Sequence, residues 1–303
     1  MTNTVTSPYR DLFVSAADGL RLYARDYGPV AGDALPVVCL SGLSRNSSDF
    51  HALALALSQD SRRPRRVLAL DYRGRGRSEW SPDWQQYDVR VELNDTSQVL
   101  IAAGIEKAVF VGTSRGGLII MALGALRPDV LAGAVLNDVG PAISPEGLRR
   151  IRGYVGKLPQ PGTFAEAAEV LRTMSGGQFP NKTGAEWEAL ARGTWSERDG
   201  RLVLSYDPNL MRTLEALDLD APLPDLWPFF DTLKAIPVMA IRGARSDLLT
   251  AETFESMQEA HPGLAAVTVP DQGHAPEFEG ELVERVRDFV AGVEAGLAET
   301  RAA

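Results

Sequence analysis

The sequence predicts an α/β fold, in which a mostly parallel central sheet is covered by helices and interrupted by a helical insertion. Apolar runs alternate with segments of helical periodicity through the first half of the chain. This alternation stops near Gly140-Pro141, and the stretch that follows, up to about residue 231, shows no clear strand–helix–strand unit. The alternation resumes at Pro237, so the core is expected to close on both sides of the insertion.

The expected strands suggest a mixed sheet. Runs at 12–14 and 20–24 flank Asp18-Gly19, which is a hairpin signal. The next runs are continuously apolar, as expected for parallel strands that are buried on both faces. They lie at 36–40, 67–70 and 108–111, and the same rhythm continues at 132–137, 237–241 and 265–269.

Segments of helical periodicity supply the connections that parallel strands require. The expected helices are residues 50–58, 89–103, 115–126, 251–260 and 279 to about 297. We therefore expect residues 1–140 and 232–303 to form an α/β core and residues 141–231 to form a helical cap inserted into it.

The composition indicates an ordinary globular protein. Of its 303 residues, 45% are hydrophobic and 23% are charged, which argues against disorder of the whole chain. A net charge of −9 argues against nucleic acid and anionic membranes as partners. The single cysteine, Cys39, fits a reducing compartment. The chain shows neither a secretory signal pattern nor an apolar run of about 18 residues, so a cytoplasmic location is expected.

The candidate nucleophile is Ser114, in Gly112-Thr113-Ser114-Arg115-Gly116. The motif lies between an expected strand and an expected helix, so a tight turn would present the hydroxyl above the sheet. Gly112 and Gly116 leave space where the two backbones come closest. A similar sequence at 42–46 lacks the final glycine and does not lie between a strand and a helix.

A serine nucleophile needs a base, and histidine is the usual one near neutral pH. Of the three histidines in the chain, His274 lies in a loop just after the last expected strand. His51 and His261 lie at a helix start and a helix end, and we interpret them as structural. His274 is therefore the expected base.

The histidine in turn needs an aspartate that holds its tautomer, placed between the serine and the histidine in the chain. Asp247 is the first choice, because it follows the expected strand at 237–241 and an acid in such a loop is the commoner arrangement. Asp138, at the end of the preceding strand, is the alternative. The oxyanion is expected to be bound by the backbone N–H groups of Arg115 and of Leu43, in the loop after the strand at 36–40.

Together with Asp71-Tyr72-Arg73-Gly74-Arg75-Gly76-Arg77-Ser78, these motifs resemble the α/β-hydrolase family over nearly the whole chain. The resemblance implies a serine hydrolase that cleaves small carboxylic esters through an acyl-enzyme. Ser41 departs from the histidine that many relatives carry there, and Ser114 disfavours the relatives with an aspartate nucleophile. Carbon–carbon bond cleavage, lactone opening and acyl transfer by the same triad stay open, as does a non-catalytic ligand-binding role.

No cofactor or metal is expected. The run at 74–79 lacks the third glycine of a dinucleotide fingerprint, and Arg73, Arg75 and Arg77 are interpreted as ion-pairing residues that hold a loop. Histidine, cysteine and acidic residues show no metal-ligand spacing. The tryptophans expected in the cap either line a substrate pocket or pack in a core, and the sequence indicates no oligomeric state.

Overall fold

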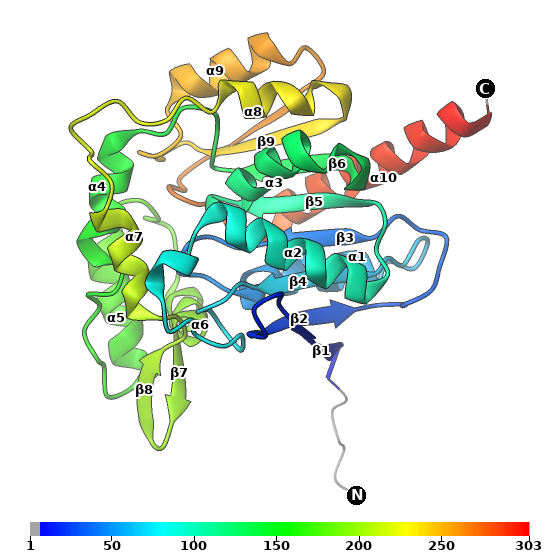
Figure 1. Ribbon diagram of the computed structural model, residues 1–303. Coiled ribbons are helices and arrows are strands. Elements are labelled where there is room, and N and C mark those ends of the chain that lie inside the picture. The colour runs from blue at the N-terminus through cyan, green and yellow to red at the C-terminus, as the bar shows by residue number, and fades with distance from the viewer. Residues whose placement is uncertain (1–6, 303) are drawn as a thin grey trace, which may run out of the picture.

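One eight-stranded sheet forms the centre of the computed structural model, which describes residues 7–302 (Figure 1). The strand order is β1-β2-β4-β3-β5-β6-β9-β10. The strands are β1 (Tyr9–Ser15), β2 (Arg21–Tyr27), β3 (Val37–Leu40), β4 (Val67–Asp71), β5 (Ala108–Thr113), β6 (Leu131–Asn137), β9 (Val238–Gly243) and β10 (Ala265–Val269). β2 pairs antiparallel with β1 and β4, and all other neighbours are parallel, which confirms the mixed sheet.

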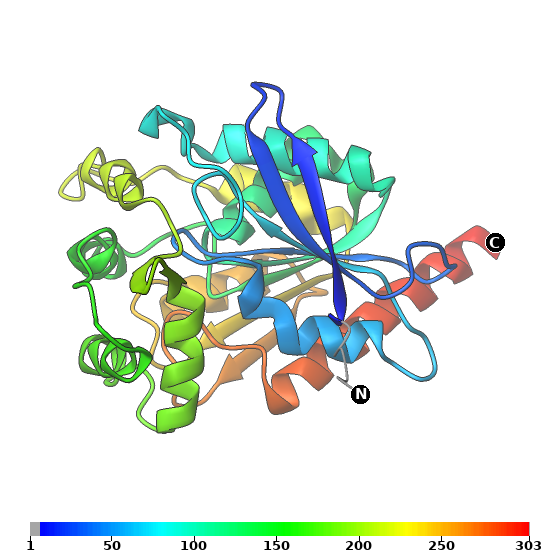
Figure 2. The same cartoon turned by 90° about the horizontal axis from the view of Figure 1, so that it is seen from below.

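Helices cover both faces of this sheet, which confirms the predicted α/β fold. One face is covered by α1 (His51–Ser58) and α10 (Gly280–Ala302), and the other by α2 (Val89–Ala103), α3 (Arg115–Leu126), α8 (Trp227–Asp231) and α9 (Ala251–Ala260). Figure 2 shows α10, in red, and α1, in blue, together on one side of the strands. Short 3-10 helices lie at Ser47–Phe50, Trp84–Gln86, Pro128–Val130, Pro208–Leu210 and Thr232–Ala235. Within residues 7–302, no helix combines the length and apolar character that crossing a membrane requires.

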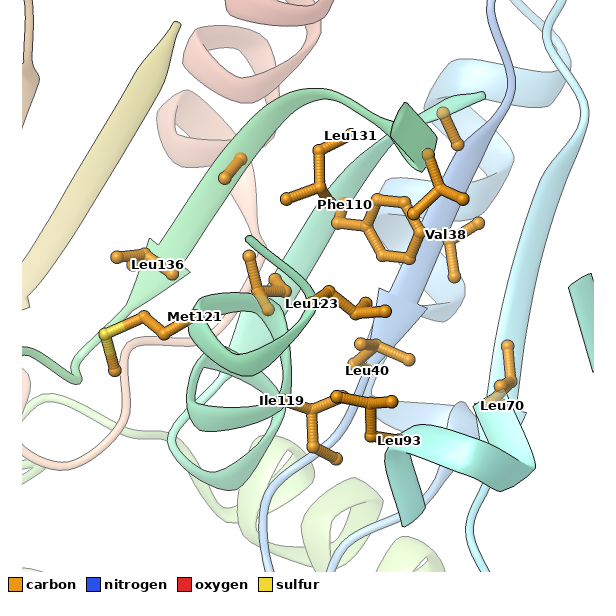
Figure 3. Close-up of a cluster of buried hydrophobic side chains, with 14 of the residues drawn as sticks. Val38, Leu40, Leu70, Leu93, Phe110, Ile119, Met121, Leu123, Leu131 and Leu136 are labelled. Carbon is orange, nitrogen blue, oxygen red and sulfur yellow. The ribbon is translucent and has the colours of Figure 1, made fainter. Parts of the chain in front are cut away.

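The central strands are buried at almost every position, because both of their faces pack against helices. On the face of α2 and α3, Leu40 and Phe110 from the sheet pack with Ile119 and Leu123 of α3 and Leu93 of α2 (Figure 3). This close packing fixes the carboxyl ends of β3, β5 and β6 relative to one another. The loops that leave those ends are therefore carried on a rigid support.

The chain between β6 and β9 leaves the sheet and forms a layer beside its carboxyl edge, at the left of Figure 1. We call residues 141–226 the inserted segment. It contains α4 (Pro145–Tyr154), α5 (Phe164–Ser175), α6 (Gly184–Thr194), α7 (Met211–Glu215) and an antiparallel hairpin of β7 (Trp195–Arg198) and β8 (Arg201–Leu204). This hairpin was not expected from the sequence. The expected cap also included α8, whereas α8 packs on α3 and its Phe230 belongs to the core of the sheet.

The tryptophans of this part of the chain are packing residues. Trp187 and Trp195 are buried in a small core of the inserted segment, together with Ala167, Ala191 and Leu202. Trp227, in α8, packs edge-on against Phe230, with ring centroids 5.7 Å apart. The inserted segment therefore has a small apolar core of its own, separate from that of the sheet.

Candidate active site

Ser114 lies in a strained turn between β5 and α3. Its φ of 51° is in the left-handed region, and its N–H donates to the carbonyl of Asn137 at 2.9 Å. The flanking glycines make this turn possible, because a Cβ on Gly116 would lie 2.1 Å from the carbonyl oxygen of Leu40. A Cβ on Gly112 would lie 2.5 Å from the carbonyl carbon of Gly116. The turn leaves Ser114 partly exposed at the carboxyl edge of the sheet.

The structure brings Ser114 together with His274 and Asp138. His274 lies in the loop after β10, and its Nε2 is 3.0 Å from Ser114 Oγ. Its Nδ1 is 2.8 Å from Oδ2 of Asp138, whose side chain is fully buried. The carboxylate of Asp138 also accepts hydrogen bonds from the N–H of Gly243 at 2.8 Å and from the hydroxyl of Ser246 at 2.6 Å. These contacts hold the carboxylate in one orientation.

The acid beside His274 is thus Asp138, which corrects the first choice of Asp247. After β9, a tight turn in which the N–H of Ser246 donates to the carbonyl of Gly243 directs Ser246 to Asp138. Asp247 instead forms a two-point ion pair with Arg150 of α4, at 2.5 and 2.9 Å. Burial by itself would raise the pKa of Asp247, but Arg150 outweighs this effect and holds the pKa below its usual value.

The two other histidines lie elsewhere and make structural contacts. His51 Nδ1 is 3.0 Å from the hydroxyl of Tyr27, and burial lowers the pKa of its imidazole. His261 is buried, with Nε2 3.2 Å from the carbonyl of Ile236. In the part of the chain that the structure describes, no group of three or more histidine, cysteine or acidic side chains is placed to hold a metal ion.

The loop after β3 passes directly beside Ser114, where a Cβ on Gly42 would lie 3.9 Å from Ser114 Cβ. Among residues 7–302, neither the N–H of Leu43 nor that of Arg115 donates to another backbone group. Arg115 is also the first residue of α3, whose N-terminal dipole favours negative charge at this point. Two available amides and a helix N-terminus next to Ser114 form an arrangement that can stabilise an oxyanion.

Three polar residues at the site were not found from the sequence. Ser246 contacts Asp138, as described above. The side-chain amide of Asn137 donates to Thr113 Oγ1 at 3.1 Å and to the carbonyl of Pro276 at 2.8 Å, so it links β5 to the histidine loop. Gln178, in the inserted segment, accepts the N–H of His274 at 3.3 Å. Only Asn137 carried a signal, because it ends a strand next to the strand that leads to Ser114.

The arginines of the run that follows β4 form ion pairs, in agreement with the sequence interpretation. Arg75 pairs with Glu92 at 2.6 Å, and both side chains are fully buried. Arg73 pairs with Asp95, and Arg77 pairs with Asp11. These pairs fix the loop between β4 and α2, and Glu92, the partner of Arg75, also pairs with Arg115 next to Ser114.

A mostly parallel sheet with a serine and a histidine meeting at its carboxyl edge defines the class of α/β-type hydrolases. The model of the alpha/beta hydrolase family matches residues 37–286, and the chain belongs to this family. The chain is 35% identical to 3-hydroxybutyrate-oligomer hydrolase of Cupriavidus necator, over 88% of this chain and 90% of that protein. It is 27% identical to an esterase of Mycobacterium tuberculosis, over 84% and 83% of the two chains. A solved alpha/beta hydrolase from Novosphingobium aromaticivorans has a TM-score of 0.85 and 38% identity, covering 94% of this chain and 99% of that one.

Proposed function

We propose that this protein is a serine hydrolase that cleaves carboxylic esters through an acyl-enzyme. The observation that carries the proposal is the unbroken chain of contacts from Ser114 to His274 to Asp138, at 3.0 and 2.8 Å. A neutral imidazole that donates its Nδ1–H to Asp138 presents the lone pair of Nε2 to the serine hydroxyl. The serine can then be deprotonated as it attacks.

In the proposed mechanism, Ser114 Oγ attacks the ester carbonyl carbon while its proton moves to His274 Nε2. The amides of Leu43 and Arg115 hold the oxyanion of the tetrahedral intermediate, and Asp138 stabilises the imidazolium. His274 then gives the proton to the leaving alcohol, and the acyl group stays on Ser114. Water, deprotonated by the same histidine, attacks the acyl-enzyme, and the acid is released as His274 returns the proton to Ser114 Oγ.

The inserted segment is proposed to act as a cap that bounds the substrate site. It is tied to the loop after β3 by hydrogen bonds from Arg45 to Thr194 at 2.6 Å and from Asn46 to the carbonyl of Gly193 at 2.8 Å. Lys182 in the segment pairs with Glu277 in the histidine loop. These contacts keep the segment close to the triad, where its side chains can exclude water and select the acyl and alcohol groups.

Esters between hydroxy acids are the first substrate class to test, because a relative matched over most of its length is by name a hydrolase of 3-hydroxybutyrate oligomers. The assay would compare 3-hydroxybutyrate dimers and trimers with p-nitrophenyl esters of rising chain length, lactones and a vinylogous diketone. A preference for the esters is expected. A preference for the diketone or the lactones would assign the same triad to one of the other reactions.

Replacement of Ser114 tests the mechanism itself. Ser114→Ala is expected to lower ester turnover on the order of 10⁶-fold, because the nucleophile is lost. A fluorophosphonate probe should label the wild-type protein at Ser114 and leave the variant unlabelled. Near-normal turnover by the variant would contradict the mechanism, and a folded wild-type protein that neither labels nor hydrolyses would favour a ligand-binding role.

A further inference from the structure

A buried cluster of three charged side chains lies next to the turn that carries Ser114. Glu92, in α2, accepts a hydrogen bond from Arg75 on Oε1 and another from Arg115 on Oε2, each at 2.6 Å. The side chains of Glu92 and Arg75 are fully buried, and that of Arg115 is 13% exposed. Two guanidinium groups share one carboxylate, so the cluster is also a buried source of positive charge.

Each arginine is linked to one of the two proposed oxyanion donors. Arg75 Nε donates to the backbone carbonyl of Leu43 at 2.7 Å, so it holds the same residue that supplies the Leu43 N–H. Arg115 supplies the second amide itself, and its Nη2 donates to the carbonyl of Tyr87 at 2.8 Å. Glu92 therefore connects the loop after β3, which it reaches through Arg75, with the start of α3, which it reaches through Arg115.

The charge of Glu92 is needed to keep these two arginines together. Burial by itself would raise the pKa of Glu92, but Arg115 and Arg75 outweigh it and hold the pKa below its usual value. Burial lowers the pKa of Arg75, and the carboxylate of Glu92 partly offsets that effect. Without the carboxylate, two guanidinium groups would face each other in a buried space, and at least one would have to move.

We propose that Glu92 is a positioning residue for the oxyanion-binding amides, acting through Arg75 and Arg115. This inference rests on the proposed function, because it assigns what aligns the amides of Leu43 and Arg115 for the reaction. A displacement of about 1 Å in such a site can cost on the order of 10²-fold in rate. Misalignment of the donors weakens binding of the transition state more than binding of the substrate, so kcat falls while KM changes little.

A second buried ion pair provides a matched control. Arg73, from the same loop, pairs with Asp95, from the same helix, at 2.7 and 2.8 Å. Both side chains are at most 3% exposed. The remaining partner of the Arg73 side chain is Asp18, in the turn between β1 and β2, so neither side chain of this pair bonds to the loops at Ser114. Only the backbone carbonyl of Arg73 contacts the first cluster, because it accepts a hydrogen bond from Arg75 Nη1 at 2.7 Å. A role in stability alone would give the two pairs the same effect on catalysis.

The test compares Glu92→Gln with Asp95→Asn, each of which replaces a carboxylate with an amide of the same shape. Folding is checked by circular dichroism and urea unfolding, and kcat and KM are measured with a p-nitrophenyl ester. The affinity for an alkyl boronic acid, which forms a tetrahedral adduct with an active-site serine, reports on the oxyanion site. Glu92→Gln is expected to lower kcat and boronate affinity about 10²-fold with KM within about 3-fold. Asp95→Asn is expected to keep both kcat and boronate affinity within about 3-fold.

The inference is overturned if folded Glu92→Gln keeps kcat within about 3-fold of wild type, matches the loss in Asp95→Asn, or changes KM instead. If Glu92→Gln does not fold, Arg75→Lys against Arg73→Lys decides by the same readouts. A lysine has one ammonium group in place of the separate Nε and Nη1 donors with which Arg75 bonds to Leu43 and Glu92. Arg75→Lys, and not Arg73→Lys, is therefore expected to lower kcat and boronate affinity. A wild-type protein that neither hydrolyses esters nor labels at Ser114 would overturn the proposed function, whereas an active wild type with unaffected variants overturns this inference alone.

Discussion

Replacing Asp138 with asparagine tests the acid of the proposed triad, and the contacts of the carboxylate define the outcome. Oδ1 faces the N–H of Gly243, a group that can only donate, so the oxygen of the new amide would stay there. The amide NH₂ would then take the place of Oδ2 and face His274 Nδ1. The imidazole would have to accept on Nδ1 and carry its proton on Nε2, toward Ser114. In that tautomer it cannot take the serine proton.

The expected loss in kcat is roughly 10⁴-fold, as for an inverted tautomer in such a triad. At 1.36 kcal/mol for each factor of ten, this corresponds to about 5.5 kcal/mol. Two opposite charges about 4 Å apart, at an effective dielectric constant of about 20, attract by about 4 kcal/mol. The lost attraction to the imidazolium is thus of the same order as the expected loss, which combines the inverted tautomer with the missing charge.

The assay measures kcat for Asp138→Asn and Asp247→Asn side by side, with urea unfolding to show that both variants fold. Asp247→Asn is expected to stay within about 10-fold of wild type, because Asp247 pairs with Arg150 and not with His274. A loss of about 10⁴-fold in Asp247→Asn, with Asp138→Asn close to wild type, would refute the reasoning.

Two further predictions concern stability. Burial would raise the pKa of Glu294, but Arg63 and Arg65 outweigh it and lower the pKa from 4.5 to about 2. A pKa lowered by folding gives stability that is present at pH 7 and is lost as the pH falls from about 4.5 toward 2. Glu294→Gln should therefore lower the free energy of unfolding by about 1–2 kcal/mol at pH 7, allowing for solvent screening, and by less at pH 3. Urea unfolding of the wild type and the variant at both pH values would contradict this if their difference were as large at pH 3 as at pH 7. Gly116→Ala should lower the free energy of unfolding by about 3 kcal/mol or prevent folding, because the new Cβ would meet the backbone of Leu40. Gly177→Ala is the control, because its Cβ would lie in open space. Equal melting temperatures of the two variants would show that the turn at Ser114 tolerates a side chain.

Much of the fold could be predicted because local signals and tertiary packing agree. The range predicted for α2 matches the structure to the residue. Its start is capped by the side chain of Asp88, which accepts the N–H of Arg90, and its end by Gly104, with φ of 65°. The hairpin of β7 and β8 carried a similar signal in Asp199-Gly200, the same dipeptide type that predicted the hairpin of β1 and β2. It was missed because each strand is only four residues long.

The choice between Asp138 and Asp247 could not be made in this way. Both follow neighbouring parallel strands, β6 and β9, and both leave the sheet at the same edge. The structure decides through backbone conformation, because Asp138 has a φ of 55° and the turn after Gly243 places Ser246 against it. Aspartate tolerates the left-handed region, but neither feature gives a sequence pattern that distinguishes Asp138 from Asp247.

Asp138 precedes the inserted segment in the chain. The residues proposed for the reaction and the segment proposed to select the substrate are therefore separate stretches of sequence. Ser114 follows β5 and Asp138 follows β6, and the inserted segment begins only after both. A chimaera that exchanged the inserted segment for the equivalent stretch of a relative would keep the proposed nucleophile Ser114, the proposed acid Asp138 and His274 on the sheet of this chain. Under the proposed function, such an exchange would change substrate preference and leave the reaction mechanism in place.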